Sequence, residues 1–214
     1  MTNHVEGKSI IITGAGGGFG RLVSEKAAAL GAKIMCADID AAAAEAVASA
    51  IRADGGIARA AGVDVRDIGQ MKGLATATVA EFGAIDVMVN NAGIAVLRPI
   101  EDMSTADWRL QNSVNLDSVF HGTKRAVALM RKSGSKGSII NISSVAGIIG
   151  VPACGAYAAA KGGVRLFSRT IAVEAAKDGI RVNSVHPGMI ATNIQGVAME
   201  DNAANYDATV ALVP

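Results

Sequence analysis

The chain has 214 residues, half of them hydrophobic, and a net charge of +1. This size and composition suit one compact domain over residues 1–214, and the near-neutral charge predicts no nucleic-acid partner. No apolar run reaches the roughly 18–20 residues that a membrane span requires, and residues 1–9 are too polar for a signal peptide, so we expect a cytoplasmic protein without membrane contact. Cys36 and Cys154 lie far apart with no histidine cluster nearby, which predicts buried thiols in a reducing compartment and no metal site.

Short apolar runs alternate with helical patterns along the first half of the chain. The β-branched run at 8–13 predicts a buried strand that leads into a glycine cluster. A helix is expected next, at 18–30, with these apolar residues on one side: Leu22, Val23, Ala27 and Leu30. Further strands are expected at 32–37, 57–63 and 85–89, and further helices at 41–53 and 67–82.

The second half continues the alternation. Residues 104–131 predict a long helix that breaks near 110–112. Two more strands are expected at 137–142 and 180–185, and one more helix at 155–177. Near-continuous hydrophobic strands between helices are typical of a Rossmann-like, doubly wound parallel sheet with helices on both faces, a three-layer α/β fold.

A glycine cluster joins the first strand to the first helix, in the sequence TGAGGGFG from Thr13 to Gly20. Glycines let the backbone turn sharply and approach a pyrophosphate, which the N-terminus of the following helix also favours. The spacing of Gly14, Gly18 and Gly20 is not the strict G-x-G-x-x-G pattern, and a P-loop is excluded because no Gly-Lys-Ser/Thr follows. The position at the first strand-to-helix turn predicts a dinucleotide site.

Asp38 lies 24 residues after Gly14, at the end of the second expected strand. In this architecture an acid at that place accepts hydrogen bonds from the adenosine ribose and repels a 2′-phosphate. The alternative is a carboxylate that only caps the next helix. No lysine or arginine stands beside Asp38 or in the glycine cluster, so we expect NAD rather than NADP.

A serine, a tyrosine and a lysine near the fifth strand have a spacing that suits acid–base chemistry. Tyr157 precedes Lys161 by four residues, so the two side chains share one face of a helix. A nearby cation favours the phenolate and lowers the pKa of a tyrosine. Ser144, thirteen residues before Tyr157, could hold a substrate oxygen, and Ser143 is the alternative serine. By itself the Tyr-x-x-x-Lys pattern also fits an ordinary surface helix.

The motifs together resemble those of the short-chain dehydrogenase/reductase family over residues 7–192. The resemblance rests on motifs in family order: Thr13–Gly20, NNAG at 90–93, Ser144, Tyr157-Ala-Ala-Ala-Lys161 and Pro187-Gly188. It implies that Tyr157 is the general acid/base, that Lys161 lowers its pKa and binds the nicotinamide ribose, and that Ser144 orients the substrate oxygen. Asn115 matches the family's catalytic asparagine, which holds a water in a proton relay.

The resemblance also implies which residues contact the cofactor, NAD. These are Gly14, Gly18, Phe19, Gly20, Asp38, Asp64, Val65, Asn91, Ala92, Gly93, Tyr157, Lys161, Pro187, Gly188 and Thr192. Phe19 stands where the family has a smaller aliphatic residue, so we expect a core role for it or altered packing beneath the pyrophosphate.

The implied activity is the interconversion of a secondary alcohol and a ketone. The residues expected around the substrate are Ser144, Tyr157, Val96, Ile149, Cys154 and Met189. Most of them are apolar, which predicts a neutral, hydrophobic substrate, cyclic or aromatic, unless these side chains only pack the loops. The alternatives are an epimerase or dehydratase with bound NAD, or a dinucleotide-binding subunit without activity.

The resemblance also implies that this chain forms a homo-oligomer, a dimer or a tetramer. Members of the family continue with a final helix and a seventh strand, whereas this chain stops at Pro214. We therefore expect either a fragment or a sheet without its edge strand. After residue 194 the sequence predicts only a loop or a short helix.

Overall fold

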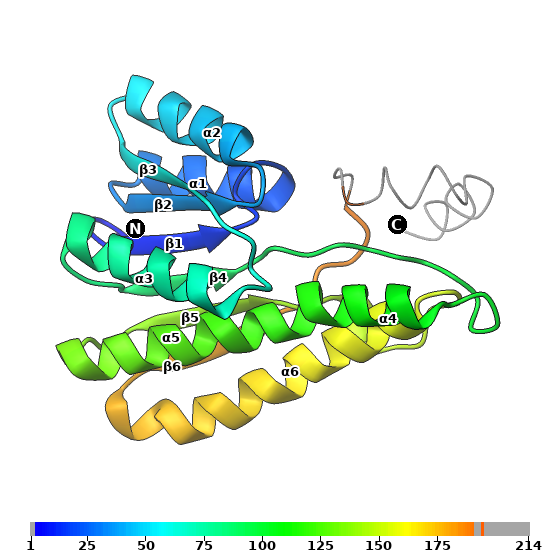
Figure 1. Cartoon of the computed structure of the whole chain (residues 1–214). Coiled ribbons are helices and arrows are strands. Elements are labelled where there is room, and N and C mark those ends of the chain that lie inside the picture. The colour runs from blue at the N-terminus through cyan, green and yellow to red at the C-terminus, as the bar shows by residue number, and fades with distance from the viewer. Residues whose placement is uncertain (1–2, 191–193, 195–214) are drawn as a thin grey trace.

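Six parallel strands form the centre of the molecule in the computed structural model, which describes residues 3–190 and 194 (Figure 1). The strand order is β3-β2-β1-β4-β5-β6, so the chain starts in the middle of the sheet and winds outward in both directions. The strands are β1 (Ser9–Thr13), β2 (Lys33–Asp38), β3 (Ile57–Gly62), β4 (Val87–Asn90), β5 (Ser138–Ile142) and β6 (Arg181–Val185). The predicted Rossmann-like parallel sheet is confirmed.

Helices cover both faces of this sheet (Figure 1). On one face, α1 (Gly18–Ala29) and α2 (Ala41–Ala53) contact β1, β2 and β3. On the other face lie α3 (Ile68–Phe82), α5 (Ser118–Ser133) and α6 (Gly155–Ala175). Each predicted helix in the described part of the chain is present, with ends shifted by a few residues. The expectations for the tail after residue 194, and Thr192, lie outside the described residues.

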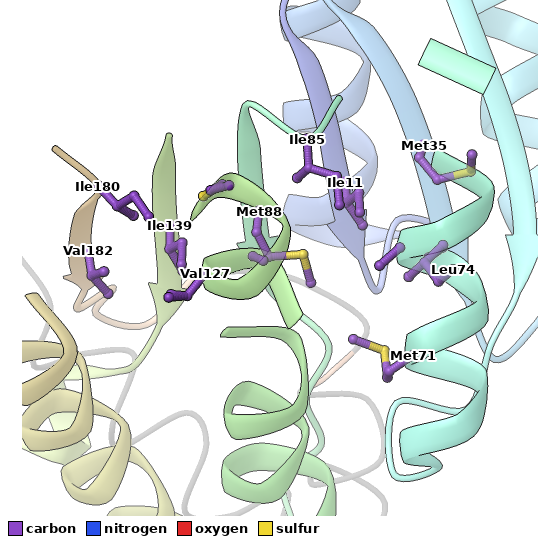
Figure 2. Close-up of a cluster of buried hydrophobic side chains, with 14 of the residues drawn as sticks. Ile11, Met35, Met71, Leu74, Ile85, Met88, Val127, Ile139, Ile180 and Val182 are labelled. Atoms are coloured by element: carbon purple, nitrogen blue, oxygen red, sulfur yellow. The ribbon is translucent and has the colours of Figure 1, made fainter. Parts of the chain in front are cut away.

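The larger hydrophobic core lies between the sheet and α3, α5 and α6. Figure 2 shows Ile11, Met88 and Ile139 from neighbouring strands, with Leu74 and Val127 from the helices that cover them. The second core lies beneath α1 and α2 and includes Ile12, Ile34 and Ile51. Both faces of the central strands are therefore buried, which explains why their sequences are continuously hydrophobic.

The buried side of α1 differs from the side that the sequence indicated. Leu22 and Leu30 are 47% and 54% exposed, whereas Gly20, Ser24 and Ala28 are buried. These three residues are small and four apart, so the helix lies close to the sheet and to the glycine cluster. The predicted helix is confirmed, but the larger apolar residues that share one side of it are not the ones that it buries.

The predicted break in the long helical region is a π-helical turn. α4 (Thr105–Asn112) passes into the π-helical segment η1 (Ser113–Asp117), and α5 follows without a gap. A π turn interrupts the ordinary α-helical register, and such turns occur frequently at functional sites. Here it carries Asn115, which is fully buried.

Candidate active site

The glycine cluster lies directly against the NNAG segment that follows β4. Gly14 has φ +66°, and a Cβ built on it would be 2.9 Å from the Cα of Ala92. A Cβ on Gly20 would overlap the carbonyl group of Gly14. Only glycine fits at both positions, because neighbouring backbone occupies the space that a Cβ would need. The resulting tight turn, called the glycine cradle below, leads into the N-terminus of α1, where an anionic group is favoured.

Thr13, which sequence reasoning passed over, holds these two segments together. Its Oγ1 accepts hydrogen bonds from the amides of Asn91 (3.0 Å) and Ala92 (3.1 Å). The side-chain amide of Asn91 donates in return to the carbonyls of Thr13 (2.9 Å) and Gly14 (3.2 Å). The predicted cofactor residues Gly14, Asn91 and Ala92 are thus brought together, although they are far apart in sequence. Gly18, with φ +50°, begins α1 beside them.

Two carboxylates stand at the ends of β2 and β3. Asp38 accepts hydrogen bonds from the amides of Gly16 (2.9 Å) and Asp40 (3.1 Å), so it borders the glycine cluster. Asp64 forms a hydrogen-bonded ion pair with Arg66 (2.6 Å), which lowers the pKa of its carboxyl. The side chain of Val65 is buried in the core, and its carbonyl accepts a hydrogen bond from His121 Nδ1 (3.2 Å).

Tyr157 and Lys161 lie one turn apart on α6, as their spacing predicted. The ammonium of Lys161 is 5.6 Å from the centroid of the Tyr157 ring and donates to the carbonyl of Ile142 (2.8 Å). Lys161 is only 3% exposed, and burial lowers its pKa to about 8. Burial also raises the pKa of Tyr157, against a smaller lowering by a hydrogen bond with Ser144. The expected lowering of the tyrosine pKa by Lys161 is therefore not found, because desolvation of the phenol dominates the shift.

The two adjacent serines have different partners. Ser143 Oγ donates to the backbone carbonyl of Lys161 (2.8 Å) and is buried beneath α6. Ser144 Oγ accepts from the amide of Ala146 (3.2 Å) and also forms the hydrogen bond with Tyr157. Ser144 is thus the hydroxyl beside the phenol, because the hydroxyl of Ser143 is used to hold the helix.

Asn115 and Lys161 meet at Gly93. A Cβ built on Gly93 would lie 3.1 Å from Asn115 Oδ1 and 3.6 Å from Lys161 Nζ. Asn115 in turn forms two hydrogen bonds, both of 2.8 Å, with the backbone amide and carbonyl of Ile94. The π turn, the NNAG segment and α6 therefore converge at one point, next to the tyrosine.

His186 is a second residue that sequence reasoning missed. Its Nδ1 is 3.2 Å from the carbonyl oxygen of Ser144 and its Nε2 is 2.9 Å from Ser184 Oγ. A carbonyl only accepts, so Nδ1 carries the proton and Nε2 accepts from the serine. Next to it, the carbonyl of Pro187 accepts from the amide of Val145 (2.9 Å). The ends of β5 and β6 are thereby fastened together, a long-range pairing that no local motif signals.

A largely apolar cavity of about 400 Å³ lies beside the cradle, between the start of α1 and the ends of β4, β5 and β6. Four predicted cofactor residues line it: Phe19, Gly20, Asn91 and Pro187. Phe19 is half-buried and faces this space, so it is not a core residue. Gly188 lies in the exposed segment that follows, and among the described residues no heavy atom lies within 4 Å of a Cβ built on it.

The expected substrate residues are distributed over three segments and do not line this cavity. Val96 is half-buried, Cys154 is buried and Ile149 is 55% exposed. Met189 is half-buried in the segment after β6. The segments that carry Val96 and Cys154 are joined by a hydrogen bond from the amide of Arg98 to the carbonyl of Ala153 (2.9 Å).

Within residues 3–190 and 194, no group of three or more histidine, cysteine and acidic side chains could hold a metal ion. No helix among the described residues has the length and apolar character needed to cross a membrane.

Comparison with known proteins gives consistent matches along most of the chain. A sequence model of the short chain dehydrogenase family matches residues 8–203. Cyclopentanol dehydrogenase of Comamonas sp. (strain NCIMB 9872) is 39% identical over 189 residues, which are 88% of this chain and 75% of the relative. NADP-dependent (R)-specific alcohol dehydrogenase of Lentilactobacillus kefiri is 41% identical over 196 residues, 90% of this chain and 77% of the relative. The crystal structure of levodione reductase matches with a TM-score of 0.89 and 35% identity, covering 94% of this chain and 80% of that chain.

Proposed function

Because the chain belongs to the short-chain dehydrogenase family of oxidoreductases, which bind a nicotinamide dinucleotide, we propose that it interconverts a secondary alcohol and a ketone with NAD(H). The observation that carries the proposal is the convergence of Asn115, Ser144, Tyr157 and Lys161 beside the glycine cradle. A protein that only bound a dinucleotide would have no need to bury an ammonium next to a tyrosine.

The residues of the cradle fit a dinucleotide. Gly14 and Gly20 let the turn pack tightly against Ala92 and against its own backbone, where a Cβ would clash. No side chain among the described residues caps the start of α1, so its first amides can bind a pyrophosphate. Asp38 would accept the adenosine ribose hydroxyls and disfavour a 2′-phosphate, which supports NAD. The relative from Lentilactobacillus kefiri is described as NADP-dependent, so membership of the family does not decide the cofactor and the proposal of NAD rests on Asp38. A nicotinamide held here would supply the hydride chemistry at the carbinol carbon.

In the oxidation direction, Tyr157 would remove the hydroxyl proton of the alcohol and Ser144 would hold the same oxygen. In reduction Tyr157 would return that proton to the carbonyl oxygen. Lys161 is suited to pass protons onward, because its pKa of about 8 is close to neutral pH. Asn115 would hold a water between Lys161 and solvent, since it lies beside the same glycine as the ammonium.

We propose a neutral, hydrophobic substrate, with a cyclic secondary alcohol as the first candidate. The predicted substrate residues Val96, Ile149, Cys154 and Met189 are apolar, and a relative that is 39% identical is a cyclopentanol dehydrogenase. An apolar wall favours a hydrocarbon ring by about 0.8 kcal/mol for each CH₂ that it buries.

The test is reduction of NAD⁺ by cyclopentanol, cyclohexanol and acyclic secondary alcohols, with NADP⁺ in parallel. The Tyr157→Phe variant removes the acid/base and keeps the ring, so turnover should fall by about 10²–10⁴-fold while NADH still binds. Activity near the wild-type level in this variant would refute the mechanism. Cofactor that copurifies tightly, without net NADH formation on any alcohol, would indicate a non-redox reaction instead.

A further inference from the structure

The segment Ile94–Val96, which follows the NNAG motif, lies outside the sheet and is held by two side-chain amides instead of a neighbouring strand. The amide of Ile94 donates to Asn115 Oδ1, and its carbonyl accepts from Asn115 Nδ2, both at 2.8 Å. The amide of Val96 donates to Gln111 Oε1 (2.7 Å), and Gln111 Nε2 donates to the carbonyl of Ile94 (2.8 Å).

Gln111 is the unexpected member of this pair. It stands in the last turn of α4, four residues before Asn115, and its side chain is 0% exposed. A carboxamide carries both an acceptor and a donor, so it can satisfy two backbone groups as a strand would. Removing a buried partner leaves those backbone groups unsatisfied, which destabilises the segment.

The two carboxamides hold different parts of the segment. Asn115 fixes Ile94, next to Gly93 and the catalytic lysine. Gln111 adds the hydrogen bond at Val96, two residues further along. The next backbone bond joins Arg98 to Ala153, close to the start of the helix that carries Tyr157. Val96 therefore lies midway between two fixed points, and Gln111 determines its position.

We infer that Gln111 is a positioning residue for substrate specificity: it sets the place of Val96 and so the shape of the wall against which the hydrocarbon part of the alcohol packs. The inference rests on the proposed function, because Val96 is a predicted substrate residue. The cofactor cradle is held separately, by Thr13 and Asn91. Loss of the Gln111 carboxamide should therefore change the choice of alcohol and leave cofactor binding intact.

The first variant is Gln111→Met, which has a similar length and volume and removes both hydrogen bonds. The matched control is Asn112→Met on the same helical turn, where the side chain bonds only to the carbonyl of Trp108 within its own helix. If the methionine variant does not fold, Gln111→Asn keeps an amide that is too short for both bonds and should give the same change to a smaller extent.

The kinetic readout is the ratio of kcat/KM for cyclopentanol to that for a longer acyclic secondary alcohol. We expect this ratio to change about tenfold in Gln111→Met, mainly through KM. A change of this size is typical when one methyl-sized contact between a substrate and an apolar pocket is lost. The dissociation constant for NADH, measured by fluorescence, should stay within about twofold of wild type, and Asn112→Met should match wild type in every readout. An unchanged ratio would overturn the inference, as would a uniform loss of kcat with an unchanged KM.

The second readout does not depend on activity. Hydrogen exchange of the peptide that covers residues 94–98 should be faster in Gln111→Met than in wild type or Asn112→Met. Unchanged exchange would show that Gln111 does not hold the segment and would overturn the inference. If the wild type oxidised no alcohol while exchange still increased in Gln111→Met, the proposed function would fail and the role of Gln111 in holding Val96 would stand.

Discussion

At the scale of single residues, the burial of Lys161 reduces the stability of the fold but suits the proposed chemistry. Its ammonium is buried and donates one hydrogen bond, to the carbonyl of Ile142. Desolvation disfavours the charged form, which is why the pKa of Lys161 falls to about 8. The same shift that suits the group to the proposed proton relay near neutral pH lowers the free energy of unfolding.

Replacing Lys161 with Met should therefore stabilise the fold by about 1–2 kcal/mol, although the bond to Ile142 is lost, and should abolish turnover. The unfolded chain holds the lysine proton up to an ordinary lysine pKa, whereas the folded chain releases it near pH 8. Rising pH above about 8 should thus stabilise wild type relative to Lys161→Met. Chemical denaturation between pH 7 and pH 10 (roughly the span of this titration) measures both effects, with Arg169→Met on the same helix as control. A less stable Lys161→Met variant at pH 7 would contradict this account.

Asp38 is the residue on which the proposed preference for NAD depends. Asp38→Asn keeps an oxygen for the amide of Gly16 and removes the negative charge, so the preference for NAD⁺ over NADP⁺ should fall by about tenfold or more. The ratio of kcat/KM for the two cofactors measures this. Asp40→Asn is the control, because Asp40 caps α2 through the amides of Ala42 and Ala43. An unchanged ratio in Asp38→Asn would show that the acid is only structural.

At the scale of secondary-structure elements, a buried polar network locks α5 and α6 onto the sheet. Asn90 Nδ2 donates to Asn141 Oδ1 (2.8 Å), and Asn141 Nδ2 donates to Ser168 Oγ (2.9 Å). Thr123 from α5 accepts from Asn90 as well (3.2 Å). The helices that present the π turn and Lys161 are thus tied to β4 and β5 by satisfied hydrogen bonds, whose loss would be costly in the dry interior.

Gly122 makes this approach possible, because a Cβ there would overlap Asn90 Oδ1. Gly122→Ala should reduce the free energy of unfolding by about 1–3 kcal/mol through overpacking and loss of the network. Gly73→Ala, in the middle of α3 with open space around it, should instead raise it by about 0.5–1 kcal/mol. Urea denaturation of both variants gives the comparison, and equal effects of the two substitutions would contradict the packing argument.

The sequence predicted the order and type of these elements because the strand patterns are dominated by burial on both faces. It also predicted the Tyr157–Lys161 pair, which depends only on spacing within one helix. It could not predict the packed side of α1, because Gly20, Ser24 and Ala28 pack through their small size and not through hydrophobicity. Partnerships such as Gln111 with Val96 require the tertiary path of a loop, which no local pattern encodes.

At the scale of the whole molecule, large apolar side chains on α5 and α6 remain exposed. Phe120, Leu166 and Val173 are 41%, 65% and 80% exposed. Leu166 and Val173 are seven residues apart and so share one side of α6. A shared apolar side on the outer layer supports the proposal that the protein forms homo-oligomers, a dimer or a homotetramer.

Sedimentation should accordingly give a mass that is a multiple of the 21.6 kDa subunit. The double substitution Leu166→Lys and Val173→Lys places charges at this surface and should shift the species toward monomer. Leu22→Lys on α1, exposed on the opposite face of the sheet, is the control and should leave the mass unchanged. A monomeric wild type would refute the proposal.

β1 lies at the centre of the sheet, and this position affects the order in which the chain folds. The cradle is closed by Thr13 and Asn91, which are 78 residues apart, and β1 pairs with β4 only after the whole β2–α3 region has been passed. Contacts of such long sequence separation form slowly, so we expect the pairing of β1 with β4 to be a late step of folding. During refolding, the protein should therefore begin to bind NADH only at a late stage, when β1 has paired with β4 and the two halves of the sheet have joined.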